Sequence, residues 1–180
     1  MSNRESKLLK NKLQHVVSLS PFFKKLLNDK SLYLNPDILE KSPKVSNQLI
    51  KLASKNIDEE DFNEHLRRCR RQLLLEIIVR DLSTTGSLGE VLDAITAFAE
   101  TAILASVEYH KSKLEKTYGI PRDSVGGALD LHVIGMGKLG GSELNVSSDI
   151  DLIFLYPEDG RTDGQEAIEN KLFFKILALK

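Results

Sequence analysis

The chain has little of what stabilises small secreted proteins or marks a membrane protein. Tryptophan is absent and Cys69 is the only cysteine among 180 residues, so no disulfide can form within the chain. The first twelve residues are charged and contain no apolar core of a signal peptide. No apolar run approaches the roughly 20 residues that cross a bilayer. We therefore expect a cytoplasmic protein without membrane contact.

An excess of charge of one sign is also lacking. The 25 Lys and Arg residues nearly balance the 26 Asp and Glu residues, for a net charge of -1. Such a balance does not favour nucleic acid as a general partner. The four histidines are scattered and none has a partner at metal-ligand spacing. Apolar residues make up 41% of the chain, enough for a hydrophobic core.

The first two-thirds of the sequence predicts helices. Ser20 and Pro21 are typical of an N-cap and the first residue of a helix. Gly119 and Pro121 are typical of the end of one. Apolar residues three or four positions apart predict helices over residues 5–17, 45–53, 58–82 and 88–118.

Four arginines, Arg67, Arg68, Arg70 and Arg71, lie within the strongest of these helical patterns. Two interpretations remain open. The arginines form a solvated face that pairs with nearby acids, or they form a contact surface for an acidic partner or a phosphate.

The pattern changes after residue 121. Residues 128–135 and 150–156 predict strands, separated by a stretch rich in glycine and serine. Residues 157–164 predict a turn, and an amphipathic helix is expected from residue 165 to the last residue, without a stop signal. We therefore expect an α+β fold with a helical region over residues 1–121 and the start of a second, truncated domain over 122–180.

The first predicted strand leads into a glycine run. Residues 133–140 read VIGMGKLG and contain G-x-G-x-x-G, which also occurs in dinucleotide-binding folds. The next strand begins about ten residues after Gly140, which leaves no room for the crossover helix of such a fold. Two readings remain. The run is a phosphate-holding loop, assisted by the charge of Lys138 and the hydroxyl of Ser142, or it is a tight turn packed on the sheet.

Two aspartates lie at the start of the second predicted strand. Because residues two apart in a strand face the same side, we expect Asp149 and Asp151 to project together, with Ile150 and Leu152 turned into a core. Neighbouring like charges repel unless a cation bridges them. Mg²⁺ suits carboxylates that share it with phosphate oxygens and waters. The alternative is a strand end with two solvated acids.

A glycine-rich loop followed by Asp-x-Asp at the start of an apolar strand resembles the polymerase-beta-like nucleotidyltransferases. Residues 135–154, GMGKLGGSELNVSSDIDLIF, are similar to the signature of the glutamine synthetase adenylyltransferase family. Residues 66–71, LRRCRR, are similar to the N-terminal part of that family. The resemblance implies that residues 122–180 form the first part of a mixed-sheet nucleotidyltransferase domain.

The resemblance also implies roles for individual residues. Asp149 and Asp151 would be the catalytic metal ligands, holding Mg²⁺. The residues implied in nucleotide and phosphate binding are Gly140, Gly141, Ser142, Ser148 and Lys138. The superfamily uses a third carboxylate on a later strand, and the acids that follow the second strand here, Glu158, Asp159 and Asp163, lie in the predicted turn.

Members of the family are longer and contain two such domains. The residues of this motif resemble those of the N-terminal copy. The resemblance implies that in this copy phosphate attacks the adenylyl-tyrosine bond of adenylylated glutamine synthetase and releases ADP. The other copy attaches AMP from ATP, and the PII signalling protein sets the direction. Two alternatives to this adenylyl-removing function remain: an inactive fragment that acts as a protein-binding helical module, and a different polymerase-beta-like nucleotidyltransferase that modifies an antibiotic or tRNA.

Overall fold

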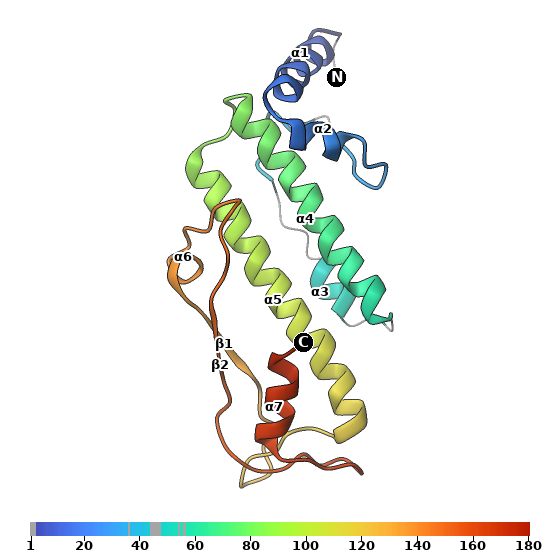
Figure 1. Cartoon of the computed structure of the whole chain (residues 1–180), viewed down its shortest axis with the longest axis vertical. Coiled ribbons are helices and arrows are strands. Elements are labelled where there is room, and N and C mark those ends of the chain that lie inside the picture. Colours follow the sequence, from blue (N-terminus) through green and yellow to red (C-terminus); the bar gives the residue numbers. More distant parts are fainter. Residues whose placement is uncertain (1–2, 36, 44–47, 54, 56) are drawn as a thin grey trace. The chain divides into compact units, whose positions relative to one another are not determined.

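A computed structural model describes residues 3–35, 37–43, 48–53, 55 and 57–180. Within these ranges the chain forms seven helices and one two-stranded sheet, which confirms the α+β fold (Figure 1). None of the described helices is long and apolar enough to span a membrane. The chain divides into two compact units. The first comprises Met1–Ser46, Ile57–Ala99 and Ser142–Ser148, and the second Asn47–Asn56, Glu100–Gly141 and Asp149–Lys180.

The first unit begins with two helices joined at Ser20. Helix α1 covers Asn3–Leu19 and α2 covers Pro21–Leu27. The Ser20 hydroxyl accepts a hydrogen bond from the Phe23 N–H at 3.1 Å, and Pro21 is the first residue of α2. Both features confirm the predicted helix start, because a serine at this place satisfies a backbone donor that has no partner within the helix.

Helix α4, Glu59–Leu82, supplies the core of the first unit. It begins after Asp58, whose carboxylate accepts a hydrogen bond from the Asp61 N–H at 2.8 Å. Residues on one face of α4 pack against α1, α2 and Ile38, as the predicted apolar stripe requires. The buried residues of this cluster are Val16, Phe23, Leu26, Ile38, Leu74, Leu75 and Val79.

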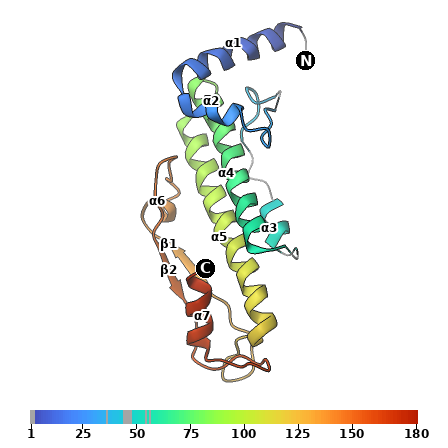
Figure 2. The same cartoon turned by 45° about the vertical axis from the view of Figure 1, so that its right-hand side comes forward.

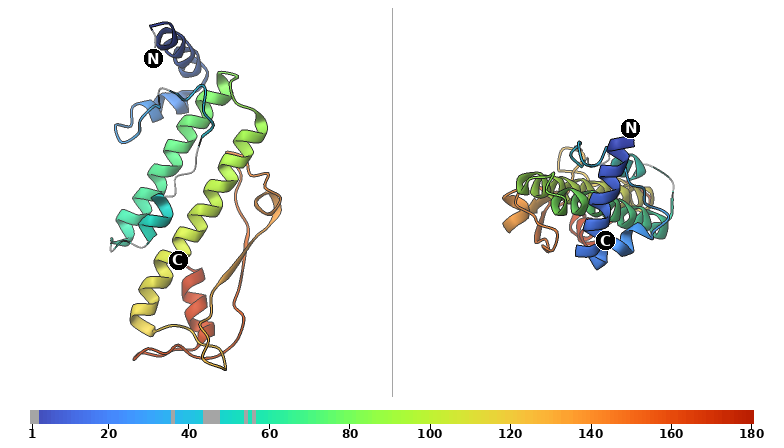
Figure 3. Two further views of the ribbon diagram at one scale, coloured as in Figure 1. Left: turned by 180° about the vertical axis from the view of Figure 1, so that it is seen from behind. Right: turned by 90° about the horizontal axis from the view of Figure 1, so that it is seen from above.

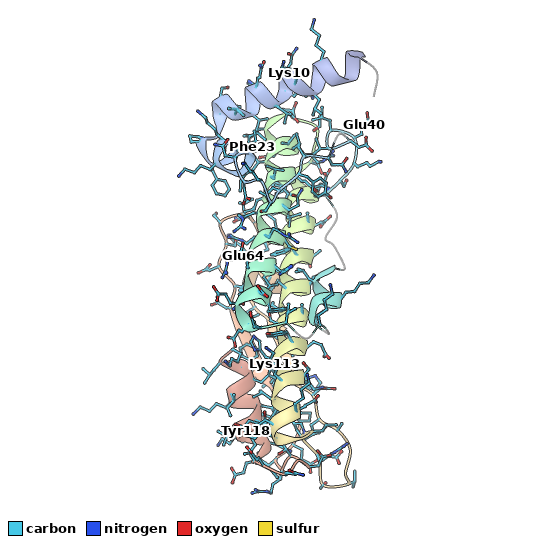
Figure 4. All side chains as sticks on the ribbon, turned by 90° about the vertical axis from the view of Figure 1, so that its right-hand side faces the viewer. Lys10, Phe23, Glu40, Glu64, Lys113 and Tyr118 are labelled. Carbon is cyan, nitrogen blue, oxygen red and sulfur yellow. The ribbon has the colours of Figure 1, made fainter. Side chains whose placement is uncertain are left out.

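The arginine cluster on α4 pairs with acids of its own unit. The Glu64 carboxylate accepts hydrogen bonds from Arg67 at 3.1 Å and from Arg71 at 2.8 Å; Figure 4 labels Glu64. Arg71 also lies 3.2 Å from an Asp29 oxygen. These contacts hold the pKa of Glu64 below its usual value, with the Arg71 hydrogen bond the largest cause. The structure thus favours the solvated, paired face for Arg67 and Arg71.

A buried arginine joins α4 to helix α5, Leu88–Tyr118. Arg80 is 5% exposed and donates to the carbonyl oxygens of Ile38 at 3.0 Å and Thr85 at 3.1 Å. Its guanidinium also forms a two-point ion pair with the Glu90 carboxylate. Four segments of the chain therefore meet at one cation whose donors are satisfied within the protein.

Helix α3, Gln48–Ala53, belongs to the second unit. It confirms the C-terminal part of the helix predicted over 45–53; residues 45–47 lie outside the described ranges. Helix α5 ends as predicted, with Gly119 at φ 83°, the left-handed conformation that glycine adopts without strain.

The sheet pairs β1, His132–Gly135, with β2, Leu152–Leu155. The strands are antiparallel, with His132 opposite Leu155 and Gly135 opposite Leu152. Both strands are shorter than the predicted 128–135 and 150–156. Residues before β1 instead form a separate turn, in which Ala128 bridges Arg122.

Two further helices complete the second unit. The four-residue helix α6, Gly137–Gly140, follows β1 directly (Figure 2). Helix α7, Asn170–Ala178, starts later than the predicted residue 165 and ends before the last residue. The Thr162 hydroxyl accepts a hydrogen bond from the Ile168 N–H at 2.9 Å, and residues 165–166 form a turn before the helix begins.

Helix α7 packs beside the C-terminal half of α5 (Figure 3). Phe173 and Phe174 are almost completely buried there, and the Tyr156 ring stacks on Phe174 at a centroid distance of 5.4 Å. The remaining buried residues of this cluster are Leu129 and Leu177. Leu131 and Tyr156, which adjoin β1 and β2 in the sequence, pack against this cluster.

Candidate functional site

Asp149 and Asp151 lie in an irregular segment directly before β2. The prediction that both stand within the strand was wrong, and so was the inward direction of Ile150, which is 40% exposed. The ladder stops early because β1 ends at Gly135 and its chain then turns into α6. One further bond, from the Met136 N–H to the Asp151 carbonyl oxygen at 2.9 Å, fixes the backbone of Asp151 beside the start of α6.

The side chains of Asp149 and Asp151 are exposed. Among the described residues, neither carboxylate has a hydrogen-bond or ion-pair partner. An ionised carboxylate is an acceptor only, so both remain available to a cation. Mg²⁺ commonly takes one or two carboxylates and completes its shell with waters and phosphate oxygens. The two aspartates fit that ion.

The described residues contain no group of three or more His, Cys, Asp or Glu side chains arranged to hold a metal. The acids after β2 are engaged elsewhere. Glu158 accepts a hydrogen bond from the Ser124 N–H at 3.0 Å, and Asp159 accepts one from the Tyr156 hydroxyl at 2.8 Å. The latter bond raises the pKa of Tyr156. These acids hold turns together, as their position in the sequence predicts.

Asp163 has a similar structural role at the end of α5. Its carboxylate accepts hydrogen bonds from the Ile120 N–H at 2.7 Å and the Arg122 guanidinium at 2.8 Å. The Ile120 bond is the largest cause that holds the pKa of Asp163 below its usual value. A carboxylate bound in this way is not free to act as the third metal ligand.

The glycine run forms α6, and the structural requirement for glycine differs between its positions. Gly137 has φ 54°, in the left-handed region. A Cβ at Gly140 would lie 2.5 Å from the Gly135 carbonyl oxygen, so a side chain cannot fit. At Gly141 the nearest atom to a Cβ is 3.5 Å away, an ordinary contact. The packed-turn reading therefore accounts for Gly140, whereas the packing leaves Gly141 open to close approach by a ligand.

The backbone donors of these glycines are already used. The Gly140 N–H donates to the Met136 carbonyl oxygen at 3.3 Å, and the Gly141 N–H donates to that of Gly137 at 3.0 Å. A phosphate beside α6 would therefore gain little from these two N–H groups. Lys138 is exposed on α6 and is the one positively charged residue in the sequence of the glycine run. Within the second unit, the structure thus brings the α6 segment and the Asp151 backbone together.

Residues 142–148 belong to the first unit, where Leu144 anchors them. The buried Leu144 N–H donates to the hydroxyl of Thr96, itself buried on α5, at 3.2 Å. Ser142 has φ 57°, a conformation that costs a non-glycine residue about 1 kcal/mol or more. Strain of this kind is frequent at functional sites, and the role of Ser142 stays a prediction. Thr84, in the turn after α4, shares this conformation.

Asn145 organises the two serines that precede Asp149. Its side-chain oxygen accepts hydrogen bonds from the Ser147 N–H at 3.1 Å and the Ser148 hydroxyl at 2.8 Å. The Ser148 hydroxyl has a single proton, and in this turn it is donated to Asn145. Ser148 therefore closes the turn, and it would have to break that bond in order to donate to a phosphate.

The sequence indicated a turn at Asn145 but did not identify Thr96. An asparagine two and three residues before serines is a pattern typical of an Asx turn, and this signal was present for Asn145. Thr96 is one polar residue in an apolar helix stripe, and nothing in that pattern predicts its bond to a residue 48 positions later.

Comparison with known proteins places the chain. A family model described as Glutamate-ammonia ligase adenylyltransferase matches residues 6–180. The bifunctional glutamine synthetase adenylyltransferase/adenylyl-removing enzyme of Aromatoleum aromaticum is 37% identical over 175 residues, covering 96% of this chain and 19% of that protein. The protein of the same name from Chromobacterium violaceum is 47% identical over 110 residues, or 61% of this chain and 12% of that protein.

These relatives are much longer than this chain, which spans at most about a fifth of their length. The matched residues nevertheless include most of the helical region, the glycine run and the two aspartates. The chain belongs to the glutamate-ammonia ligase adenylyltransferase family.

Proposed function

We propose that this chain carries the metal-binding part of an adenylyl-removing site that acts on adenylylated glutamine synthetase. The observation that carries the proposal is the pair of exposed carboxylates without protein partners, Asp149 and Asp151, placed between α6 and β2. Acids that serve the fold of this chain are bonded, as Asp163 and Glu158 are. Acids left free in the run shared with the family are suited to a ligand.

The proposed reaction is a phosphorolysis. An oxygen of inorganic phosphate attacks the phosphorus of the adenylyl-tyrosine, the bond from phosphorus to the tyrosine oxygen breaks, and that oxygen takes up a proton. The products are ADP and unmodified glutamine synthetase. When bound between Asp149 and Asp151, Mg²⁺ would neutralise the charge that develops on the transferring group.

The chain's own groups have distinct proposed roles. Lys138 adds positive charge on α6 for the incoming phosphate, and the absence of a side chain at Gly141 permits its close approach. The Ser142 hydroxyl donates to a phosphate oxygen. Gly140 acts through packing, since a side chain there would meet Gly135. Ser148 closes the Asn145 turn, and we propose that it lies beside the bound phosphate.

The names of the relatives support the choice of substrate. They describe an enzyme that both adds and removes the adenylyl group of glutamine synthetase. ATP as the donor of the opposite reaction, the PII signalling protein as regulator, Mg²⁺ as cofactor and a cytoplasmic location remain proposals. The division of this part of the sequence into a helical region, 1–121, and the start of the transferase domain, 122–180, is likewise a proposal.

Product identity tests the proposed reaction. The chain is incubated with adenylylated glutamine synthetase, Mg²⁺ and ³²P-labelled phosphate, and nucleotides are separated by chromatography. We expect the label in ADP, with a yield that depends on phosphate. Release of unlabelled AMP would show hydrolysis instead. Absence of any released nucleotide, with the chain folded by circular dichroism, would favour the alternative of a protein-binding helical module.

A further inference from the structure

The first thirty residues differ in charge from the rest of the chain. They contain seven Lys and Arg residues against two Asp and Glu residues, a net charge of +5, although the whole chain has a net charge of -1. The lysines whose side chains are exposed in this segment are Lys7, Lys10, Lys24, Lys25 and Lys30. A local excess of this size attracts acidic groups even when the whole protein is nearly neutral.

A groove runs along α1 in this basic segment. Its volume is about 500 Å³, room for more than one side chain of a ligand. The floor is mainly aliphatic and the rim contains one cation and one amide. The lining residues are Leu9, Lys10, Leu13, Gln14 and Val17 of α1 and Leu27 of α2. Figure 4 labels Lys10 on α1 and Phe23 on α2, the two helices that contribute these residues.

Large apolar side chains are exposed on the same two helices. The exposed fraction is 54% for Leu8, 54% for Leu19, 49% for Phe22 and 40% for Leu27. An apolar surface rimmed by charged residues is typical of a site that binds a protein or a membrane. Leu13 and Val17 also pack against the core that contains Val16 and Phe23, so the floor of the groove is held by the fold.

We propose that the groove between α1 and α2 is a docking site for an acidic amphipathic helix of a partner protein. Aliphatic side chains of that helix would enter the groove over Leu13 and Val17, and its Glu or Asp residues would lie against Lys10 and the neighbouring lysines. Recognition of an amphipathic helix by an apolar groove uses side chains at i, i+3 and i+4, and the surrounding charges select the partner.

The shape of the site favours a helix over an anionic membrane surface. A membrane-bound helix inserts a convex apolar face into the lipid, whereas much of the apolar surface of α1 is turned toward its own core, with Val16 fully buried. A concave groove accepts single side chains that project from a partner. The inference does not rest on the proposed adenylyl-removing function.

Binding of a designed probe tests the inference. The probe is an 18-residue fluorescein-labelled peptide of leucine, alanine and glutamate, with leucines at helical i, i+3, i+4 and i+7 positions and glutamates on either side. The control peptide has glutamine in place of every glutamate, with the same leucine pattern. Anisotropy titrations with the full 180-residue chain give the two dissociation constants. We expect the acidic peptide to bind at least about ten-fold more tightly than its control.

Charge-matched variants locate the site. Lys10→Glu and Lys30→Glu change the net charge equally, but only Lys10 lines the groove. We expect Lys10→Glu to weaken binding of the acidic peptide by about ten-fold or more and Lys30→Glu by about two-fold or less. Leu27→Ser should weaken it several-fold. Leu104→Ser, which removes a 63% exposed leucine from α5, should have no effect.

Each other outcome overturns the inference. Equal loss in Lys10→Glu and Lys30→Glu would show general attraction to a basic segment. Equal binding of the two peptides would show that the groove does not recognise acidic residues. Absence of binding by the acidic peptide at 100 µM, about the weak end of such interactions, would remove the docking site. Tighter binding of phosphatidylglycerol vesicles than of the peptide, lost in Lys10→Glu, would assign the surface to a membrane instead.

Discussion

The junction of α4 and α5 and the segment before β2 use charge in opposite ways. At the junction, Arg80 is buried and donates to Ile38, Thr85 and Glu90. Before β2, Asp149 and Asp151 are exposed, and their carboxylates have no partner among the described residues. A buried charge is tolerated only when the protein supplies it with hydrogen-bond and ion-pair partners. An exposed pair of like charges without partners adds no favourable interaction to the fold. The comparison separates charge that holds this chain together from charge that is available to a ligand.

Replacing Arg80 should have the largest effect on stability. Arg80→Met keeps most of the side-chain volume but leaves the Glu90 carboxylate and the Ile38 carbonyl oxygen without their donor. We expect a loss of about 3–5 kcal/mol in the free energy of unfolding, measured by urea denaturation. Arg70→Met removes an exposed arginine of the same helix and should change it by about 0.5 kcal/mol or less. Equal effects of the two substitutions would contradict the account of the junction.

A smaller loss of stability is expected where the hydrogen bond from Leu144 to Thr96 anchors residues 142–148. Thr96→Val preserves the shape of the side chain and leaves the buried Leu144 N–H unpaired, at a cost of about 1–3 kcal/mol. Thr96→Ser keeps the acceptor and should recover most of that loss. If the serine and valine variants unfold at the same urea concentration, the bond from Leu144 to Thr96 does not hold the loop.

The smallest expected effect is a pH dependence at the junction. Hydrogen bonding to Arg80 is the largest cause that holds the pKa of Glu90 below its ordinary value of 4.5. Its stabilising contribution is therefore complete above that value and is lost as the pH falls through the lower, folded pKa. Glu90→Gln should show a shallower loss of stability below pH 4.5 than the unaltered chain. Glu166→Gln, at an exposed glutamate, should leave the pH profile unchanged, and a matching change there would contradict the assignment.

Much of the helical architecture could be predicted from the sequence because local signals and packing agree. The Ser20 cap, the apolar stripe of α4 and the end of α5 at Gly119 follow from side-chain spacing and backbone preference. Contacts distant in sequence could not be predicted in this way. The burial of Arg80 depends on Ile38, 42 residues earlier, and no local pattern distinguishes Arg80 from a solvated arginine.

The site residues inferred from the sequence stay a prediction, and their backbone conformation was predicted only in part. The alternation of Asp149, Ile150 and Asp151 indicated a strand, but strand pairing ends at Leu152 because β1 is short. The glycine run indicated a loop, and it forms the short helix α6 because the Gly140 and Gly141 N–H groups bond back along the chain. Pairing partners and backbone bonds decide both features, and a single sequence contains neither.

We propose that Asp149 and Asp151 serve a ligand and not the fold. The most direct test measures two properties of Asp149→Asn together: release of ADP from adenylylated glutamine synthetase with phosphate and Mg²⁺, and the free energy of unfolding in urea without Mg²⁺. We predict a loss of ADP release of about 100-fold or more, with a change in stability of about 0.5 kcal/mol or less. Retained ADP release would contradict the metal assignment, and a large loss of stability would show that this carboxylate belongs to the fold.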